Sequence, residues 1–97
     1  MRVTIIPQDG KVVIDGKSYD GIDLSSIQSN IHAIQWYDTY GEIEILDNRG
    51  NHIKNQEITS FDDYLFVVDL WKIADNEQKK KELEFKAALE AKIGQIL

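Results

Sequence analysis

His32 and His52 are the side chains of this 97-residue chain best suited to acid–base chemistry or metal binding near neutral pH. Either role needs partners at a defined spacing, such as a second histidine four residues along a helix or a pair of nearby carboxylates. Neither histidine has such a partner in the sequence. We expect both to be structural residues that flank the ends of a hairpin.

Asp47 begins a segment that superficially resembles a calcium-binding loop, Asp47-Asn48-Arg49-Gly50-Asn51. The calcium loop of helix–loop–helix proteins has a glycine at its sixth position and a bidentate glutamate at its twelfth. Here the glycine is fourth and the twelfth position is Ile58. The segment is therefore predicted to be a turn.

The remaining candidate groups also lack the spacing that chemistry requires. Asp62 and Asp63 are neighbours that point in different directions on a helix, and the helix dipole explains both of them. Ser25 and Ser26 lack the glycine-flanked elbow of a nucleophilic serine, and the chain has no cysteine. We predict no catalytic, cofactor-binding or metal-binding site, and a protein that is not an enzyme.

Composition and charge narrow the classes of partner. Hydrophobic residues make up 42% of the chain and charged residues 29%, as in one small globular domain. The formal net charge of −6 disfavours nucleic acid, and the basic run Lys79, Lys80 and Lys81 is flanked by glutamates. No apolar run approaches the roughly 20 residues that cross a bilayer. We expect no nucleic-acid or membrane partner, and a location in the cytoplasm of the producing cell.

The pattern of apolar residues changes at Ser60, so different secondary-structure elements are expected before and after it. Before it, short alternating stretches are separated by turn signals such as Asp15-Gly16 and Asp20-Gly21. This pattern predicts a small antiparallel β-meander of five or six short strands. The predicted strands are residues 2–6, 11–15, 17–19, 31–38, 42–46 and 52–54.

Two further expectations concern the middle of the chain. The connector 21–27 is predicted to be held to the core by Ile22, Leu24 and Ile27. In the strand that follows, simple alternation places Ile31 and Ile34 on opposite faces.

After Ser60 the apolar residues recur at helical spacing, and Ser60 itself is a suitable N-cap. Residues 60–74 have a broad apolar face that suits covering the sheet. Apolar residues are absent from Asp75 to Glu82, and a narrow stripe then resumes. The prediction is an α+β domain in which 1–74 form the sheet body with its packing helix, and 75–97 form a charged, amphipathic helical extension. This extension either projects as one long helix or folds back as a hairpin near Asp75-Asn76.

Seven apolar side chains are candidates for protein interaction. Three aromatic residues lie near a strand end or off the main helical stripe, where exposure favours binding. Four more form the narrow stripe of the extension, which needs another protein or a second copy of the chain to cover it. The seven are Tyr37, Tyr40, Phe66, Phe85, Leu89, Ile93 and Ile96.

The first 71 residues resemble a family of small phage and prophage proteins encoded beside tail-fibre and tail-tip genes. The shared pattern is Ile5-Ile6-Pro7-x-Asp9-Gly10, Val13-Ile14-Asp15-Gly16, Ile22-Asp23-Leu24-Ser25, Ile31-His32-Ala33-Ile34-Gln35-Trp36, Gly41-x-Ile43-Glu44, Ile58-Thr59 and Leu70-Trp71. The resemblance implies a tail-fibre assembly factor or minor tail component that binds a phage tail or tail-fibre protein. Its location would be the bacterial host cytoplasm or the virion tail. The resemblance does not reach the extension after Asp75.

Three functional hypotheses follow. The first is a non-enzymatic phage protein whose helix binds a tail or fibre protein, with self-association through the C-terminal helix as a further possibility. The second is an acidic phage inhibitor of a host defence complex, which predicts an acidic face built from Asp38, Glu42, Glu44 and Asp47. The third is a small enzyme or ligand-binding module, which would need a deep pocket lined by a histidine and carboxylates.

Overall fold

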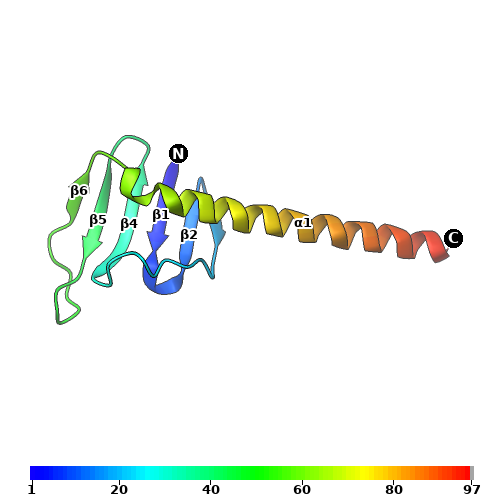
Figure 1. Ribbon diagram of the computed structural model, residues 1–97, viewed down its shortest axis with the longest axis horizontal. Helices are drawn as coiled ribbons and strands as arrows, with labels where there is room; N and C mark the ends of the chain where they lie inside the picture. The colour runs from blue at the N-terminus through cyan, green and yellow to red at the C-terminus, as the bar shows by residue number, and fades with distance from the viewer. Residues whose placement is uncertain (97) are drawn as a thin grey trace.

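The computed structural model describes residues 1–96, and the side chains of residues 1–94. A six-stranded antiparallel sheet is followed by one long helix, which confirms the predicted α+β fold (Figure 1). The strands are β1 (Arg2–Ile6), β2 (Lys11–Ile14), β3 (Lys17–Tyr19), β4 (Ile31–Tyr37), β5 (Gly41–Ile45) and β6 (Gln56–Ile58). The helices are the 3-10 turns η1 (Pro7–Asp9) and η2 (Asp62–Tyr64), and the α-helix α1 (Leu65–Ile96).

The sheet consists of two three-stranded meanders joined side by side. The strand order is β3-β2-β1-β4-β5-β6, so β1 pairs with both β2 and β4 in the centre. The connector between β3 and β4 therefore carries the chain from one edge back to the middle. Its residues Ile22, Leu24 and Ile27 are buried in the core, as predicted.

Two local features differ from simple alternation. The register between β4 and β5 shifts between Ile31 and Ala33, which marks a bulge at His32. The extra residue changes the phase of the strand, so Ile31 joins Ile34 in the core cluster and the prediction of opposite faces is wrong.

The sixth strand also lies later than the predicted 52–54. His52 makes only an isolated bridge with Leu46, and pairing with β5 resumes at Gln56. The carboxylate of Asp47 accepts hydrogen bonds from the backbone N–H groups of Arg49 and Asn51, which confirms the predicted turn. This turn closes tightly after β5, so the returning chain meets Leu46 once and leaves the sheet before β6.

The core lies between one face of the sheet and a layer made of the connector and α1. Val3, Ile5, Val12 and Ile34 are fully buried from the sheet side, and Val67 is fully buried from the helix. On the opposite face of the sheet, the Thr4 hydroxyl donates a hydrogen bond to Gln35 Oε1 at 2.7 Å.

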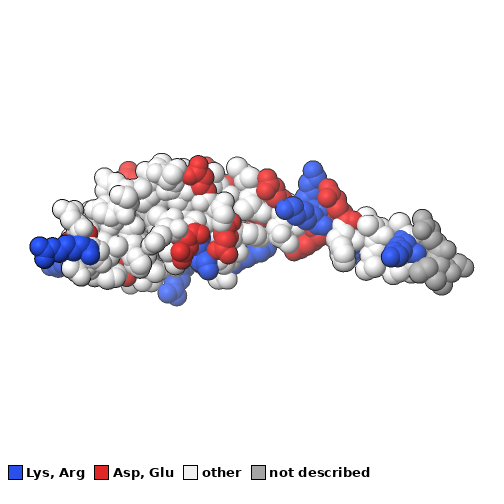
Figure 2. Space-filling model, turned by 90° about the horizontal axis from the view of Figure 1, so that it is seen from below, with Lys and Arg blue, Asp and Glu red and all other residues white. Residues whose placement is uncertain are grey.

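The helix continues far beyond the sheet. Of the two forms expected for the C-terminal part, the structure has the single long helix, because α1 runs through Asp75 and Asn76 without a turn. The molecule measures 64 × 29 × 18 Å with a radius of gyration of 18.2 Å, whereas a compact domain of this length has about 13 Å. Figure 2 shows charged side chains of both signs gathered where the narrow helix leaves the wider body.

Gly41 marks a place where two strands approach too closely for a side chain. A Cβ at this position would collide with the carbonyl oxygen of Gln35 and lie 2.9 Å from Cε3 of Trp36. We expect Gly41→Ala to lower the free energy of unfolding by about 1–3 kcal/mol, measured by chemical denaturation. Gly94→Ala is the matched control, because a Cβ there meets no atom within 4 Å. Equal stability of the Gly41 variant and the wild type would contradict this account.

Candidate protein-interaction site

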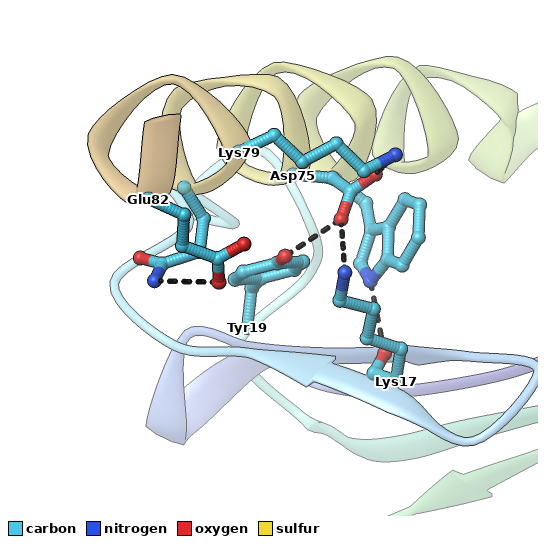
Figure 3. Close-up of polar contacts among 7 residues, drawn as sticks. Lys17, Tyr19, Asp75, Lys79 and Glu82 are labelled. Carbon is cyan, nitrogen blue, oxygen red and sulfur yellow. Dashed lines mark hydrogen bonds and ion pairs between the residues drawn. The ribbon is translucent and has the colours of Figure 1, made fainter. Parts of the chain in front are cut away.

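Asp75 is the buried carboxylate at the point where α1 leaves the sheet, and only 7% of it is exposed. Three donors surround it (Figure 3). The Tyr19 hydroxyl donates to Oδ1 at 2.6 Å, and Lys17 Nζ lies 2.7 Å from the same oxygen. Lys79 Nζ, one turn along the helix, lies 2.9 Å from Oδ2. We call Lys17, Tyr19, Asp75 and Lys79 the anchor.

Trp71 supports the anchor from the preceding turn of the helix. Its indole N–H donates a hydrogen bond to the Lys17 carbonyl oxygen at 3.0 Å. Its ring meets the Tyr19 ring edge-on, with centroids 5.5 Å apart. The two turns of α1 are thus tied to the edge strand β3, and the direction of the helix at the sheet edge follows from this contact.

The hydrogen bonds and ion pairs of the anchor favour the ionised carboxylate of Asp75 and the protonated ammonium group of Lys17. The hydrogen bond with Lys17, followed by those with Tyr19 and Lys79, holds the pKa of Asp75 well below its usual range. The same pairing with Asp75 raises the pKa of Lys17 to about 12. The bond to the Asp75 carboxylate, together with burial, raises the pKa of Tyr19. Three groups from two elements therefore stabilise one another's charge and protonation states.

The burial of Asp75 was not predicted, although the sequence contains a signal for it. Tyr64, Val68, Trp71 and Asp75 are spaced by four, three and four residues, which places all four on one side of a helix. An acid that continues an apolar stripe is a candidate for a buried, paired carboxylate. The partner Lys17 lies far away in sequence, so only the tertiary structure identifies it.

Beyond Asp75 the helix projects from the body (Figure 1), with Lys79 reaching back to the Asp75 carboxylate. Every described side chain from Asn76 to Gly94 is exposed. We call residues 76–96 the tail and its side chains Phe85, Leu89 and Ile93 the tail stripe. They are 72%, 47% and 50% exposed. The side chain of Ile96, the fourth predicted member, lies outside the described residues.

The tail stripe continues the sheet-facing side of α1. Leu89 follows Trp71, and Ile93 follows Asp75, by eighteen residues, which is about five complete helical turns. The tail therefore presents in solution the side that packs against the sheet within the body.

The three predicted aromatic residues lie elsewhere. Tyr37 and Tyr40 stack across the turn between β4 and β5 with centroids 5.2 Å apart, and the Arg2 guanidinium lies 5.3 Å from the Tyr37 ring centre. Tyr40 is 56% exposed, whereas Tyr37 is half-buried. Phe66 is 36% exposed on the first turn of α1. The predicted interaction residues thus occupy three separate places.

The groups considered for metal chemistry are arranged differently. The rings of His32 and His52 touch edge to face with centroids 5.1 Å apart. Within residues 1–94, no group of three or more histidine, aspartate or glutamate side chains is placed to hold a metal ion. The histidine pair is an aromatic contact between β4 and the segment before β6.

Comparisons with known proteins do not identify a family. No family model matches the chain, and no curated protein or solved structure matches it. In the part of the chain that the structure describes, no helix combines the length and apolar character needed to cross a bilayer. The resemblance to phage proteins therefore stays a prediction.

The anchor is tested by neutralising its carboxylate. We expect Asp75→Asn to lower the midpoint of thermal unfolding, because Lys17 and Lys79 lose the charge that pairs with them. Asp69→Asn is the matched control, since it removes the same charge from an exposed position of the same helix. Equal midpoints for the two variants would show that Asp75 has no anchoring role.

The pH dependence supplies a separate test. A carboxyl with a lowered folded-state pKa stabilises the fold above its unfolded pKa of about 4, and this stabilisation is lost as pH falls through the folded pKa. The stability difference between wild type and Asp75→Asn should therefore be constant from about pH 7 to 5 and shrink in stronger acid. Urea denaturation across this range measures the difference. A stability difference that grew as the pH fell would contradict a stabilising role of the ionised Asp75 carboxylate.

Proposed function

We propose that the protein is a non-enzymatic protein-binding module, in which the sheet body holds the tail out as a docking helix. The observation that carries this proposal is the tail stripe, an exposed apolar row on the part of α1 that projects beyond the sheet (Figure 1). An amphipathic helix docks by placing such a row in an apolar groove of its partner.

The attachment of α1 to the sheet body also favours docking by the tail. A free helix of this length is marginal in water because its first turn is costly to form. Here the first turns of α1 are held by the sheet and the anchor, so the tail extends from a preformed helix. A partner therefore binds a helix that is already ordered, which lowers the entropic cost of binding.

The resemblance supplies the partner class, a phage tail or tail-fibre protein. The tail would cover an apolar surface of the fibre until assembly, as a chaperone does, or remain as a minor tail component. The protein would then occur in the host cytoplasm or in the virion tail.

A second candidate function, inhibition of a host defence complex by an acidic surface, is favoured by one observation. Glu42 of β5 stands directly opposite Glu57 of β6, although like charges in this position destabilise a sheet. Glu44 follows at the next position on the same face of β5. The other two predicted acids have local partners, since Asp38 pairs with the Met1 ammonium group at 2.8 Å and Asp47 closes its turn.

Co-purification with the tail or tail-fibre protein encoded beside the gene tests the proposed function. We expect Phe85→Glu/Leu89→Glu to weaken binding at least about a hundredfold, since each buried apolar side chain is worth about 1.5 kcal/mol or more. The matched control is Ala87→Glu/Ala91→Glu, which adds two charges to the opposite side of the tail. Binding by Phe85→Glu/Leu89→Glu that equals that of the wild type would contradict the proposal. Loss of binding only with Glu42→Gln/Glu57→Gln would favour the acidic-surface function.

A further inference from the structure

The helical layer leaves part of the sheet uncovered. α1 begins over the middle of the sheet and runs over β1, β2 and β3, so it does not extend over β5 and β6 (Figure 1). A groove of about 380 Å³ lies there. Its floor is formed by the half-buried Ile45 and Ile58 and by Ile31 and Ile43, which are almost completely buried. Its walls are polar and apolar, and include the connector residue Gln28, the polar residues Asn30 and Gln56, and the helix-start residues Asp63, Tyr64 and Phe66.

We propose that this groove receives the tail stripe of a second copy of the chain, so that copies associate head to tail. The inference rests on the proposed function only in that the tail stripe is a docking surface. It adds a receptor site on the body and names its occupant.

The geometry requires the contact to be between copies. The groove borders the first turn of α1, and the tail stripe lies near the far end of the same continuous helix. The tail leads away from the sheet along the 64 Å axis of the molecule and cannot return to its own groove (Figure 1).

The two surfaces match in length and in packing mode. Phe85 to Ile93 spans about 12 Å of helix, and β4 to β6 spans about 10 Å across the strands. The tail stripe is the continuation of the side with which α1 packs on β2 and β3. A second tail in the groove would thus extend the existing helical layer over the uncovered strands.

The charges of the two parts are also complementary. Residues 1–75 carry thirteen acidic and six basic side chains, whereas residues 76–97 carry four acidic and five basic. With the stripe in the groove, Lys80 and Lys81 would lie beyond the β6 edge, where Glu57 is exposed. Residues 1–75 therefore have a net charge of −7 and residues 76–97 a net charge of +1, so body and tail attract each other weakly, whereas two bodies repel.

Pairing of two tails is the less favourable arrangement. Each tail stripe offers only three described apolar side chains, and the exposed Leu83 lies on another side of the helix. Three side chains bury far less than the roughly 800 Å² per partner of a typical stable interface. Docking into the groove adds the half-buried Ile45 and Ile58 and the ring of Phe66 to the buried surface. Because stripe and groove are different surfaces, the contact repeats from copy to copy and does not close as a two-fold dimer.

A mixing experiment by analytical ultracentrifugation tests this arrangement on the full chain. We expect the wild type to form a concentration-dependent series of species. Phe85→Glu/Leu89→Glu lacks the stripe, and Phe66→Lys carries a charge into the groove, so each alone should be monomeric. Their equimolar mixture should form a one-to-one complex, because one variant keeps the groove and the other keeps the stripe. Ala87→Glu/Ala91→Glu should associate like the wild type.

Several results would overturn the inference. A wild type that is monomeric at the highest attainable concentration excludes it. Association of Phe66→Lys equal to that of the wild type would show that tails pair with each other, and an inert mixture would show that stripe and groove do not meet. Ile58→Lys, on the groove floor, provides a second groove variant, with circular dichroism to verify folding. Co-purification of Phe66→Lys with the fibre protein separates this inference from the proposed function, because fibre binding needs only the stripe.

Discussion

The buried carboxylate of Asp75 is the interaction on which the shape of the molecule depends. It is accommodated only because Lys17, Tyr19 and Lys79 supply charge and hydrogen bonds that replace water. Two of these partners belong to the edge strand β3, so the carboxylate ties the helix to the last strand it crosses. Apolar packing alone would allow α1 to slide or rotate over the sheet, whereas a directional network fixes its position.

The anchor divides α1 into a part that packs on the sheet and a part that projects beyond it. Before Asp75, the sheet-facing side of α1 buries Val67 and Val68 and completes the core. After it, the same side carries apolar residues with no sheet beneath them. The helix continues because adding residues to an existing helix costs little free energy once packing has stabilised its first turns. The Gln78–Glu82 hydrogen bond at 3.3 Å stabilises the helix further. The stretch of helix between the anchor and the tail stripe is mostly polar and is exposed to solvent.

The arrangement of the sheet has a matching consequence. Because β4 returns to the centre beside β1, the helix covers β1 to β3 and does not extend over β5 and β6. The molecule thus has an exposed apolar row without a sheet at one end, and at the other a groove of polar and apolar side chains that the helix does not cover. Both follow from a helix that starts over the middle of the sheet and runs in one direction.

Much of the fold is determined by the sequence itself. Alternation sets the buried faces of β1 and β2, the Asp15-Gly16 pair adopts the positive φ angles of 47° and 85° that its hairpin needs, and helical spacing after Ser60 specifies a helix. The spacing leaves open whether the far part of this helix projects or folds back. These features arise from neighbours in the chain, which is why local periodicity reveals them. The tertiary structure alone decided the strand order, the bulge that turns Ile31 inward, and the pairing of Asp75 with Lys17 and Tyr19. Each of these depends on contacts between residues far apart in sequence, whose energies no local pattern records.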